Sequence, residues 1–133
     1  LTHISTETLK GLKEEFSKSR PDLVIVQGDT TSAFIGALAA FYDGINIGHV
    51  EAGLRTNDLM NPYPEEANRR LISQIATLHF APTAAAANNL NSFGITKNVS
   101  ITGNTVIDSM KMLLGKKKNV PEGLKLNFDT ARL

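Results

Sequence analysis

The chain begins with an amphipathic pattern followed by an apolar one. Apolar side chains recur at helical spacing in the first twenty residues, at Leu9, Leu12 and Phe16, with lysines and glutamates between them. This spacing predicts a helix that Ser5 or Thr6 caps and that Pro21 ends. Residues 22–27 then form a nearly continuous apolar run rich in β-branched side chains, which is typical of a strand covered on both faces in a parallel sheet.

The same alternation continues along the chain. The pattern predicts helices at about 32–43, 65–76, 83–93 and 105–114, and strands at 45–50, 78–81 and 98–102, with a polar loop over 54–63 and Pro64 opening the helix that follows it. Strands that alternate with helices of about ten residues indicate βαβ units. We therefore expect an α/β fold with a doubly wound parallel sheet over residues 1–115, and a linker over residues 116–133.

Composition and charge exclude several classes of protein. The 133 residues are 41% hydrophobic and 20% charged, as in globular domains, and 14 basic against 13 acidic side chains leave a net charge of +1. This balance gives no electrostatic reason to expect a nucleic acid or a membrane surface as partner. The absence of cysteine excludes disulfides and thiolate chemistry and fits the cytoplasm. Because the sequence opens at Leu1 in a helical pattern, we expect it to be part of a longer protein.

Two carboxylates follow buried strands directly. Asp29 comes after the strand at 22–27, and Glu51 after the strand at 45–50. Since the carboxyl ends of parallel strands meet at one edge of the sheet, both side chains are expected at that edge, where open α/β sheets bind ligands. Asp29 could instead cap the following helix. Glutamate is a poor cap, and a Glu51 carboxylate partly removed from water could exchange protons near neutrality.

Other polar residues have structural explanations. Glu65 and Glu66 lie in the first turn of a helix, four residues before Arg69 and Arg70, which is the spacing of helical ion pairs. His49 and His79 fall inside strands, where a hydrogen-bonded core histidine is expected rather than a base. No histidine pair has helical metal-ligand spacing, and no dinucleotide-binding, phosphate-loop or serine-hydrolase motif is present. No metal site is therefore expected.

Five segments, taken in order, resemble those of a known family. They are residues 21–31, 48–56, 64–71, 79–83 and 102–108, and they resemble the motifs of the non-hydrolysing bacterial UDP-N-acetylglucosamine 2-epimerases. The resemblance implies a two-domain enzyme of the glycosyltransferase-B type, of which this chain is part of the first Rossmann-like half. It also implies a cytoplasmic homodimer that serves cell-surface polysaccharide synthesis and requires no cofactor.

The implied reaction interconverts UDP-N-acetylglucosamine and UDP-N-acetylmannosamine by elimination and re-addition of UDP. By motif match, Asp29, Glu51 and Glu65 are the catalytic carboxylates, and Asp29 and Glu51 also touch the substrate. Arg55 either anchors its loop or meets an anionic group of the substrate. Because the family's second domain has no counterpart in these residues, the chain alone is expected to be inactive.

Two other functions compete with this one. A hydrolysing relative would release N-acetylmannosamine and UDP, although the surroundings of Asp29, Glu51 and Glu65 resemble the non-hydrolysing branch more closely. The second alternative is not an enzyme: the chain would be a structural or dimerisation domain without catalysis.

Overall fold

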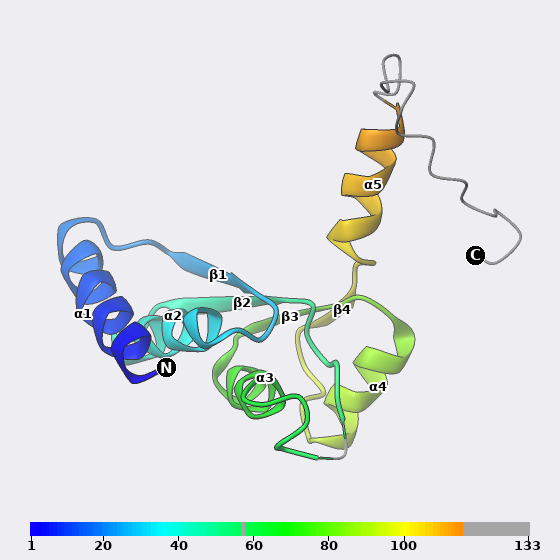
Figure 1. Ribbon diagram of the computed structural model, residues 1–133, viewed down its shortest axis with the longest axis horizontal. Helices are drawn as coiled ribbons and strands as arrows, with labels where there is room; N and C mark the ends of the chain where they lie inside the picture. The colour runs from blue at the N-terminus through cyan, green and yellow to red at the C-terminus, as the bar shows by residue number, and fades with distance from the viewer. Residues whose placement is uncertain (57, 116–133) are drawn as a thin grey trace, which may run out of the picture.

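The computed structural model describes residues 1–56 and 58–115 as a parallel α/β unit (Figure 1). The elements are α1 (Thr2–Lys18), β1 (Leu23–Gln27), α2 (Thr31–Tyr42), β2 (Asn46–Val50), α3 (Glu65–Ile75), β3 (Leu78–Ala81), α4 (Ala84–Ser92), β4 (Val99–Ile101) and α5 (Thr105–Gly115). All strand pairs are parallel, in the order β1-β2-β3-β4. The predicted alternation is confirmed, while the linker predicted over 116–133 lies outside the described residues.

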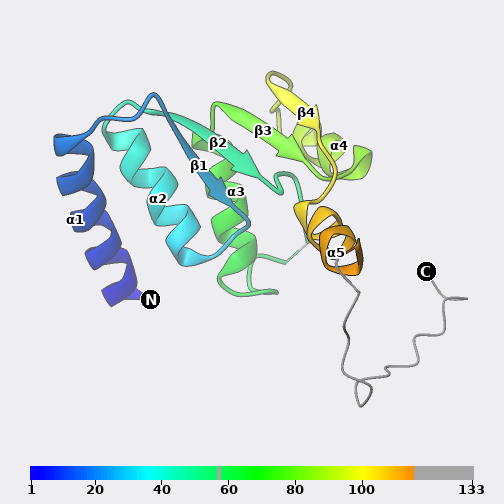
Figure 2. The ribbon, with the colours of Figure 1, turned by 90° about the horizontal axis from the view of Figure 1, so that it is seen from above.

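One face of the sheet carries the helical layer. Helices α2, α3 and α4 lie on the same side of the strands, α1 packs beside α2 beyond the β1 edge of the sheet, and α5 projects from the opposite side (Figures 1 and 2). Right-handed crossovers between successive neighbouring strands place their helices on one side, which accounts for this layer. The main core lies between it and the first two strands, where Val26, Ile47 and Ile72 are buried together. A second cluster under β3 and β4 centres on Ala81 and Leu90.

The other face of the sheet is open around β1. Ile25 is 61% exposed, and a Cβ placed on Gly48 would contact both Ile25 and Phe80, so these side chains share that face. The expectation that β1 is covered on both faces is therefore wrong for the described residues. Its apolar run supplies one face to the core through Val26 and leaves the other face uncovered.

Two helix starts differ from the sequence prediction. Helix α1 begins at Thr2, before the predicted caps, and the hydroxyls of Ser5 and Thr6 donate to the carbonyls of Leu1 and Thr2. Serine and threonine can satisfy a carbonyl one turn back as well as cap a helix, and the sequence does not distinguish the two uses. Pro64 is the N-cap of α3 rather than its first residue.

Gly53 fixes the contact between the loop after β2 and helix α4. Its φ of 89° lies in the left-handed region, and a Cβ at this position would overlap the Ala86 carbonyl. Asn89 closes the contact, since its Nδ2 donates to the Gly53 carbonyl at 2.9 Å. Only glycine combines this backbone conformation with so close an approach.

The Gly53→Ala substitution should therefore destabilise the chain by about 2–4 kcal/mol, because it adds both backbone strain and a steric overlap. Gly11→Ala is the matched control: nothing lies within 4 Å of a Cβ there, and alanine favours the helix by up to about 1 kcal/mol. Urea unfolding of the two variants measures both effects. Equal stabilities would contradict the close packing of Gly53 on α4.

Candidate active site

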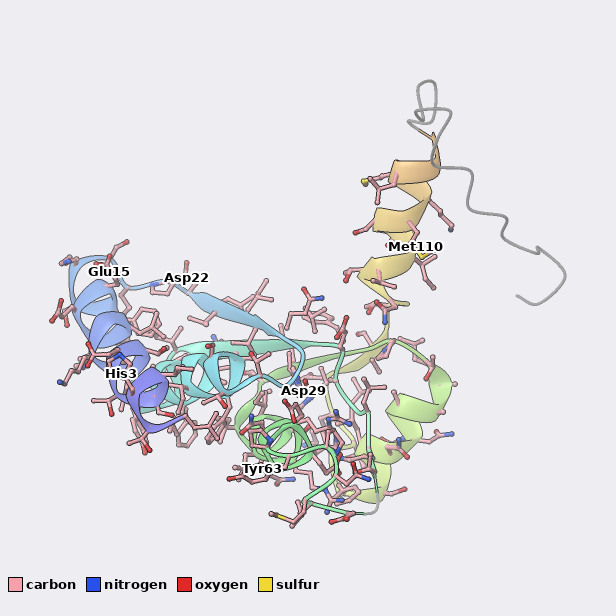
Figure 3. The ribbon with its side chains drawn as sticks, viewed as in Figure 1. His3, Glu15, Asp22, Asp29, Tyr63 and Met110 are labelled. Carbon is pink, nitrogen blue, oxygen red and sulfur yellow. The ribbon has the colours of Figure 1, made fainter. Side chains whose placement is uncertain are left out.

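Asp29 and Glu51 lie at the same edge of the sheet, as their positions after adjacent strands predicted. Gln27 and Val50 are register partners at the ends of β1 and β2, and the Gly28 N–H donates to the Val50 carbonyl at 3.0 Å. A Cβ placed on Gly28 would lie 3.7 Å from Oε2 of Glu51. Both carboxylates are partly exposed, and Figure 3 shows Asp29 at the end of β1, close to α3.

The backbone at Glu51 is unusual. Its φ of 65° lies in the left-handed region, which glutamate rarely adopts and which costs of the order of 1 kcal/mol. The side chain is held by Gln27, whose Nε2 donates to Oε1 of Glu51 and to Oγ1 of Thr105, each at 3.2 Å. Sequence reasoning missed Gln27. Its signal was a polar side chain ending an otherwise apolar strand next to the Gly28 turn.

Asp29 is tied to helix α3. Its Oδ2 lies 2.5 Å from Nη2 of Arg69, and its carbonyl accepts a hydrogen bond of 2.9 Å from Nδ2 of Asn68. The cap of α2 is Thr30, whose Oγ1 accepts from the Ala33 N–H. The alternative that Asp29 caps this helix is therefore wrong, and its carboxylate stands 24% exposed at the sheet edge.

The two neighbouring glutamates of α3 have different surroundings. Glu66 is fully buried, pairs with Nε of Arg70 at 2.6 Å, and accepts from the Thr56 N–H at 3.0 Å. The structural interpretation of Glu66 is confirmed by these contacts. Glu65 is partly exposed in the first turn. The four-residue spacing suggested an ion pair between Glu65 and Arg69. In the structure Arg69 instead forms ion pairs with Asp29 and Glu66.

Arg55 has the contacts of a loop anchor. Its Nη1 donates to the Leu54 carbonyl at 2.7 Å and its Nη2 to Oγ of Ser73 at 2.9 Å. The guanidinium carbon lies 5.1 Å from the centre of the Phe93 ring, within the range of a cation–π interaction. These contacts connect the loop after β2 to α3 and to the end of α4, which favours the first of the two predicted roles of Arg55.

His49 and His79 are core histidines, as predicted. They are 0% and 3% exposed, and Nε2 of His49 donates to the Gly28 carbonyl at 2.8 Å. Burial lowers the pKa of His49 to about 4, although the hydrogen bond to Gly28 opposes this change. Burial also lowers the pKa of His79. His49 is thus a neutral side chain that supports the turn before Asp29.

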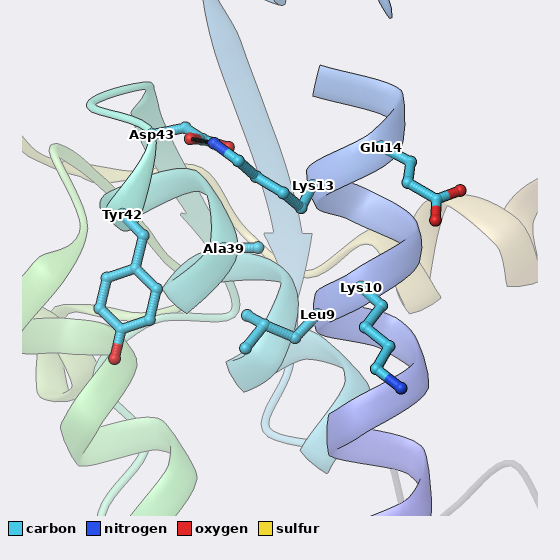
Figure 4. A pocket seen from close by; sticks show the side chains of 7 residues that line it. All are labelled: Leu9, Lys10, Lys13, Glu14, Ala39, Tyr42 and Asp43. Carbon is cyan, nitrogen blue, oxygen red and sulfur yellow. Dashed lines mark hydrogen bonds and ion pairs between the residues drawn. The ribbon is translucent and has the colours of Figure 1, made fainter. Parts of the chain in front are cut away.

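A separate hollow of about 520 Å³ lies between α1 and α2, lined by Leu9, Ala39 and Tyr42 among others (Figure 4). Lys13 and Asp43 form an ion pair at its rim. None of the three predicted catalytic carboxylates lines it.

Over residues 1–56 and 58–115, no helix combines the length and apolar character that crossing a membrane requires.

A parallel sheet with partly exposed carboxylates at the ends of adjacent strands defines a Rossmann-like unit, a class of fold in which ligands bind at the carboxyl edge of the sheet. The sequence model of the family described as UDP-N-acetylglucosamine 2-epimerase matches residues 1–131. The chain belongs to this family, which confirms the family resemblance predicted from the sequence.

Individual relatives agree with this assignment. The chain is 50% identical over 119 residues to UDP-N-acetylglucosamine 2-epimerase of Neisseria meningitidis, with 89% of the chain and 32% of the relative covered. It is also 50% identical over 111 residues to UDP-N-acetylglucosamine 2-epimerase of Escherichia coli strain K12, with 83% of the chain and 30% of the relative covered. The chain therefore spans about a third of the length of the relatives it matches.

Solved structures give the same result. The Neisseria meningitidis enzyme bound to UDP-GlcNAc superposes with a TM-score of 0.83 at 49% identity, with 86% of this chain and 32% of that chain covered. The Methanocaldococcus jannaschii enzyme in complex with UDP-GlcNAc and UDP gives 0.80 at 40% identity, with 86% and 32% covered.

The buried His49 predicts a pH dependence of stability. Its folded-state pKa of about 4 lies below the unfolded value of 6.5, so the unfolded chain binds more protons between these values. The contribution of His49 to the free energy of unfolding is therefore fully present above pH 6.5. It is lost as the pH falls toward 4, which lowers the free energy of unfolding by up to about 3 kcal/mol. Urea unfolding at several pH values in this range should show that the free energy of unfolding depends less steeply on pH in His49→Gln than in the original chain. His3→Gln, on the exposed surface of α1, should leave the slope unchanged. An unchanged slope in His49→Gln would contradict the prediction.

Proposed function

We propose that this chain is the carboxylate-bearing part of an isomerase that interconverts UDP-N-acetylglucosamine and UDP-N-acetylmannosamine. The observation that carries the proposal is the placement of Asp29 and Glu51 on adjacent strand ends, both partly exposed. Relatives at 49% and 40% identity, whose structures hold UDP-GlcNAc, support the choice of substrate.

The chemistry needs a group that removes a proton and a group that returns one. Loss of the C2 proton and of UDP from C1 gives 2-acetamidoglucal, and UDP then adds back while a proton arrives on the opposite face of C2. No electron is gained or lost overall, so the reaction requires no redox cofactor. Asp29 and Glu51 touch the sugar and exchange these protons, and Glu65 is the third catalytic carboxylate.

A second wall must complete the site. Elimination leaves a neutral glucal that would escape from an open edge, so the intermediate has to be enclosed. We assign residues 1–115 to part of a first Rossmann-like domain and 116–133 to the connection toward a second domain, in a two-domain arrangement of the glycosyltransferase-B type. The chain alone is then inactive.

The proposal includes the setting of the enzyme. A cytoplasmic homodimer that supplies cell-surface polysaccharide synthesis is consistent with this substrate. Phe41 and Tyr42, which are 53% and 67% exposed at the end of α2, support a subunit contact near the hollow between α1 and α2.

A chimera tests the activity directly. Residues 1–115 replace the matching segment of the Neisseria meningitidis enzyme, which is 50% identical and therefore suited to accept them. In heavy water, proton NMR should show deuterium entering C2 of both UDP-sugar epimers. Release of free N-acetylmannosamine would instead indicate the hydrolysing reaction, and a folded chimera without turnover would indicate a structural role. Either result contradicts the proposal.

Glu51→Gln in the same chimera should lower turnover by about 10²–10⁴-fold, because the amide keeps the shape of the side chain but cannot exchange the proton. Glu7→Gln, on the exposed surface of α1, is the matched control and should have no effect. Steady-state rates and circular dichroism separate loss of chemistry from loss of fold. Near-normal turnover of folded Glu51→Gln would remove Glu51 from the mechanism.

A further inference from the structure

The described part of the chain contains a buried cluster of charges below the carboxyl edge of the sheet. The Glu66 carboxylate is fully buried and lies within ion-pair distance of two guanidinium groups, those of Arg69 and Arg70. Burying such charges costs desolvation energy, and apolar side chains of similar size stabilise a core at least as well. Stability alone therefore does not explain why α3 carries three charged residues here.

Arg69 differs from Arg70 in what it reaches. Its Nη1 lies 3.3 Å from Oε2 of the buried Glu66, and its Nη2 lies 2.5 Å from Oδ2 of Asp29 at the sheet edge. Arg70 pairs with Glu66 through its Nε, and its Nη2 donates to the Thr56 carbonyl. Arg69 thus connects a buried anion to a carboxylate that faces solvent, and its own side chain is only 12% exposed.

Arg69 also has an unsatisfied polar atom. Its Nε is buried and has no hydrogen-bond partner among the described residues, which is a further cost. A guanidinium placed for stability alone would be expected to use this donor. The geometry instead serves the two terminal nitrogens, which meet Glu66 and Asp29.

The turn that carries Asp29 is held at its backbone as well. The Asn68 side chain donates to the Asp29 carbonyl at 2.9 Å, and His49 donates to the Gly28 carbonyl at 2.8 Å. With the backbone fixed from α3 and from β2, the remaining freedom of Asp29 is the rotation of its side chain. The ion pair with Arg69 restricts that rotation.

Glu51 is held by a weaker partner. Among the described residues, its carboxylate accepts a hydrogen bond from the neutral amide of Gln27 at 3.2 Å, which is longer and carries no charge on the donor. The two carboxylates at the edge therefore differ in how firmly they are oriented.

We propose that Arg69 is a positioning residue, which orients the Asp29 carboxylate toward the substrate and is itself held in place by the buried Glu66. The inference rests on the proposed function, because it acts through Asp29 in the same reaction. Lysine cannot replace Arg69, since one ammonium group cannot reach two anions on different sides with the planar geometry of a guanidinium.

The test uses Arg69→Lys in the chimera, alone and combined with Asp29→Asn. Misplacement of a catalytic group by about 1 Å costs roughly 10²-fold, so kcat should fall about 100-fold in Arg69→Lys while KM changes less than about 3-fold. In the Asp29→Asn background, Arg69→Lys should cause no further loss, because its effect passes through Asp29. Arg70→Lys, the matched control, should cause the same factor of loss in both backgrounds.

The outcomes separate this inference from the proposed function. A wild-type chimera without epimerisation contradicts the proposed function. An active chimera in which Arg69→Lys lowers kcat by the same factor with and without Asp29→Asn contradicts the positioning role, because a merely structural effect would persist in both backgrounds.

The contact itself is tested in the 133-residue chain without any turnover. Asp29→Asn should shift the side-chain nitrogen resonances of Arg69 in ¹⁵N NMR spectra, and Asp22→Asn, at the other end of β1, should not. An Arg69 spectrum that ignores Asp29→Asn overturns the inference.

Discussion

The parallel pairing of β1 with β2 is the constraint on which the candidate site depends. Gln27 and Val50 are opposite each other at the last position of both strands, so the chain leaves the sheet at the same level in each. The hydrogen bond from Gly28 to the Val50 carbonyl extends the pairing one residue into the turn. A shift of register by one residue would exchange the two faces of β2 and move Glu51 away from Asp29.

Several unfavourable local features gather around this edge. Glu51 adopts a left-handed backbone conformation, and Glu66 is a fully buried carboxylate. Within residues 1–56 and 58–115, the buried Nε of Arg69 has no hydrogen-bond partner. The core formed by Val26, Ile47 and Ile72 lies beside them and contributes apolar burial that offsets such costs. Strain and buried charge at the edge of an apolar core are typical of sites selected for chemistry rather than for stability.

Periodicity was sufficient for the order of the elements and for the location of the edge. The prediction for β3 agrees residue for residue with Leu78–Ala81, because a short buried strand bounded by polar turns has a local signal. The ion pair between Asp29 and Arg69 joins residues 40 positions apart, and no local spacing indicates it. Local spacing suggested Glu65 as the partner of Arg69, but the position of α3 next to the turn after β1 decided the contact. The open face of β1 was not predicted for a similar reason, because an apolar run does not indicate whether one or both faces of the strand are covered.

The central claim is that Asp29 and Glu51 together form the acidic side of a sugar-nucleotide site. A crystal structure of the chimera with UDP-N-acetylglucosamine tests this claim most directly. The account predicts that carboxylate oxygens of Asp29 and Glu51 lie within about 3–3.5 Å of the sugar ring, with at least one of them directed at C2. A bound sugar whose C2 faces neither carboxylate, or a UDP-sugar bound at another edge of the sheet, would contradict it.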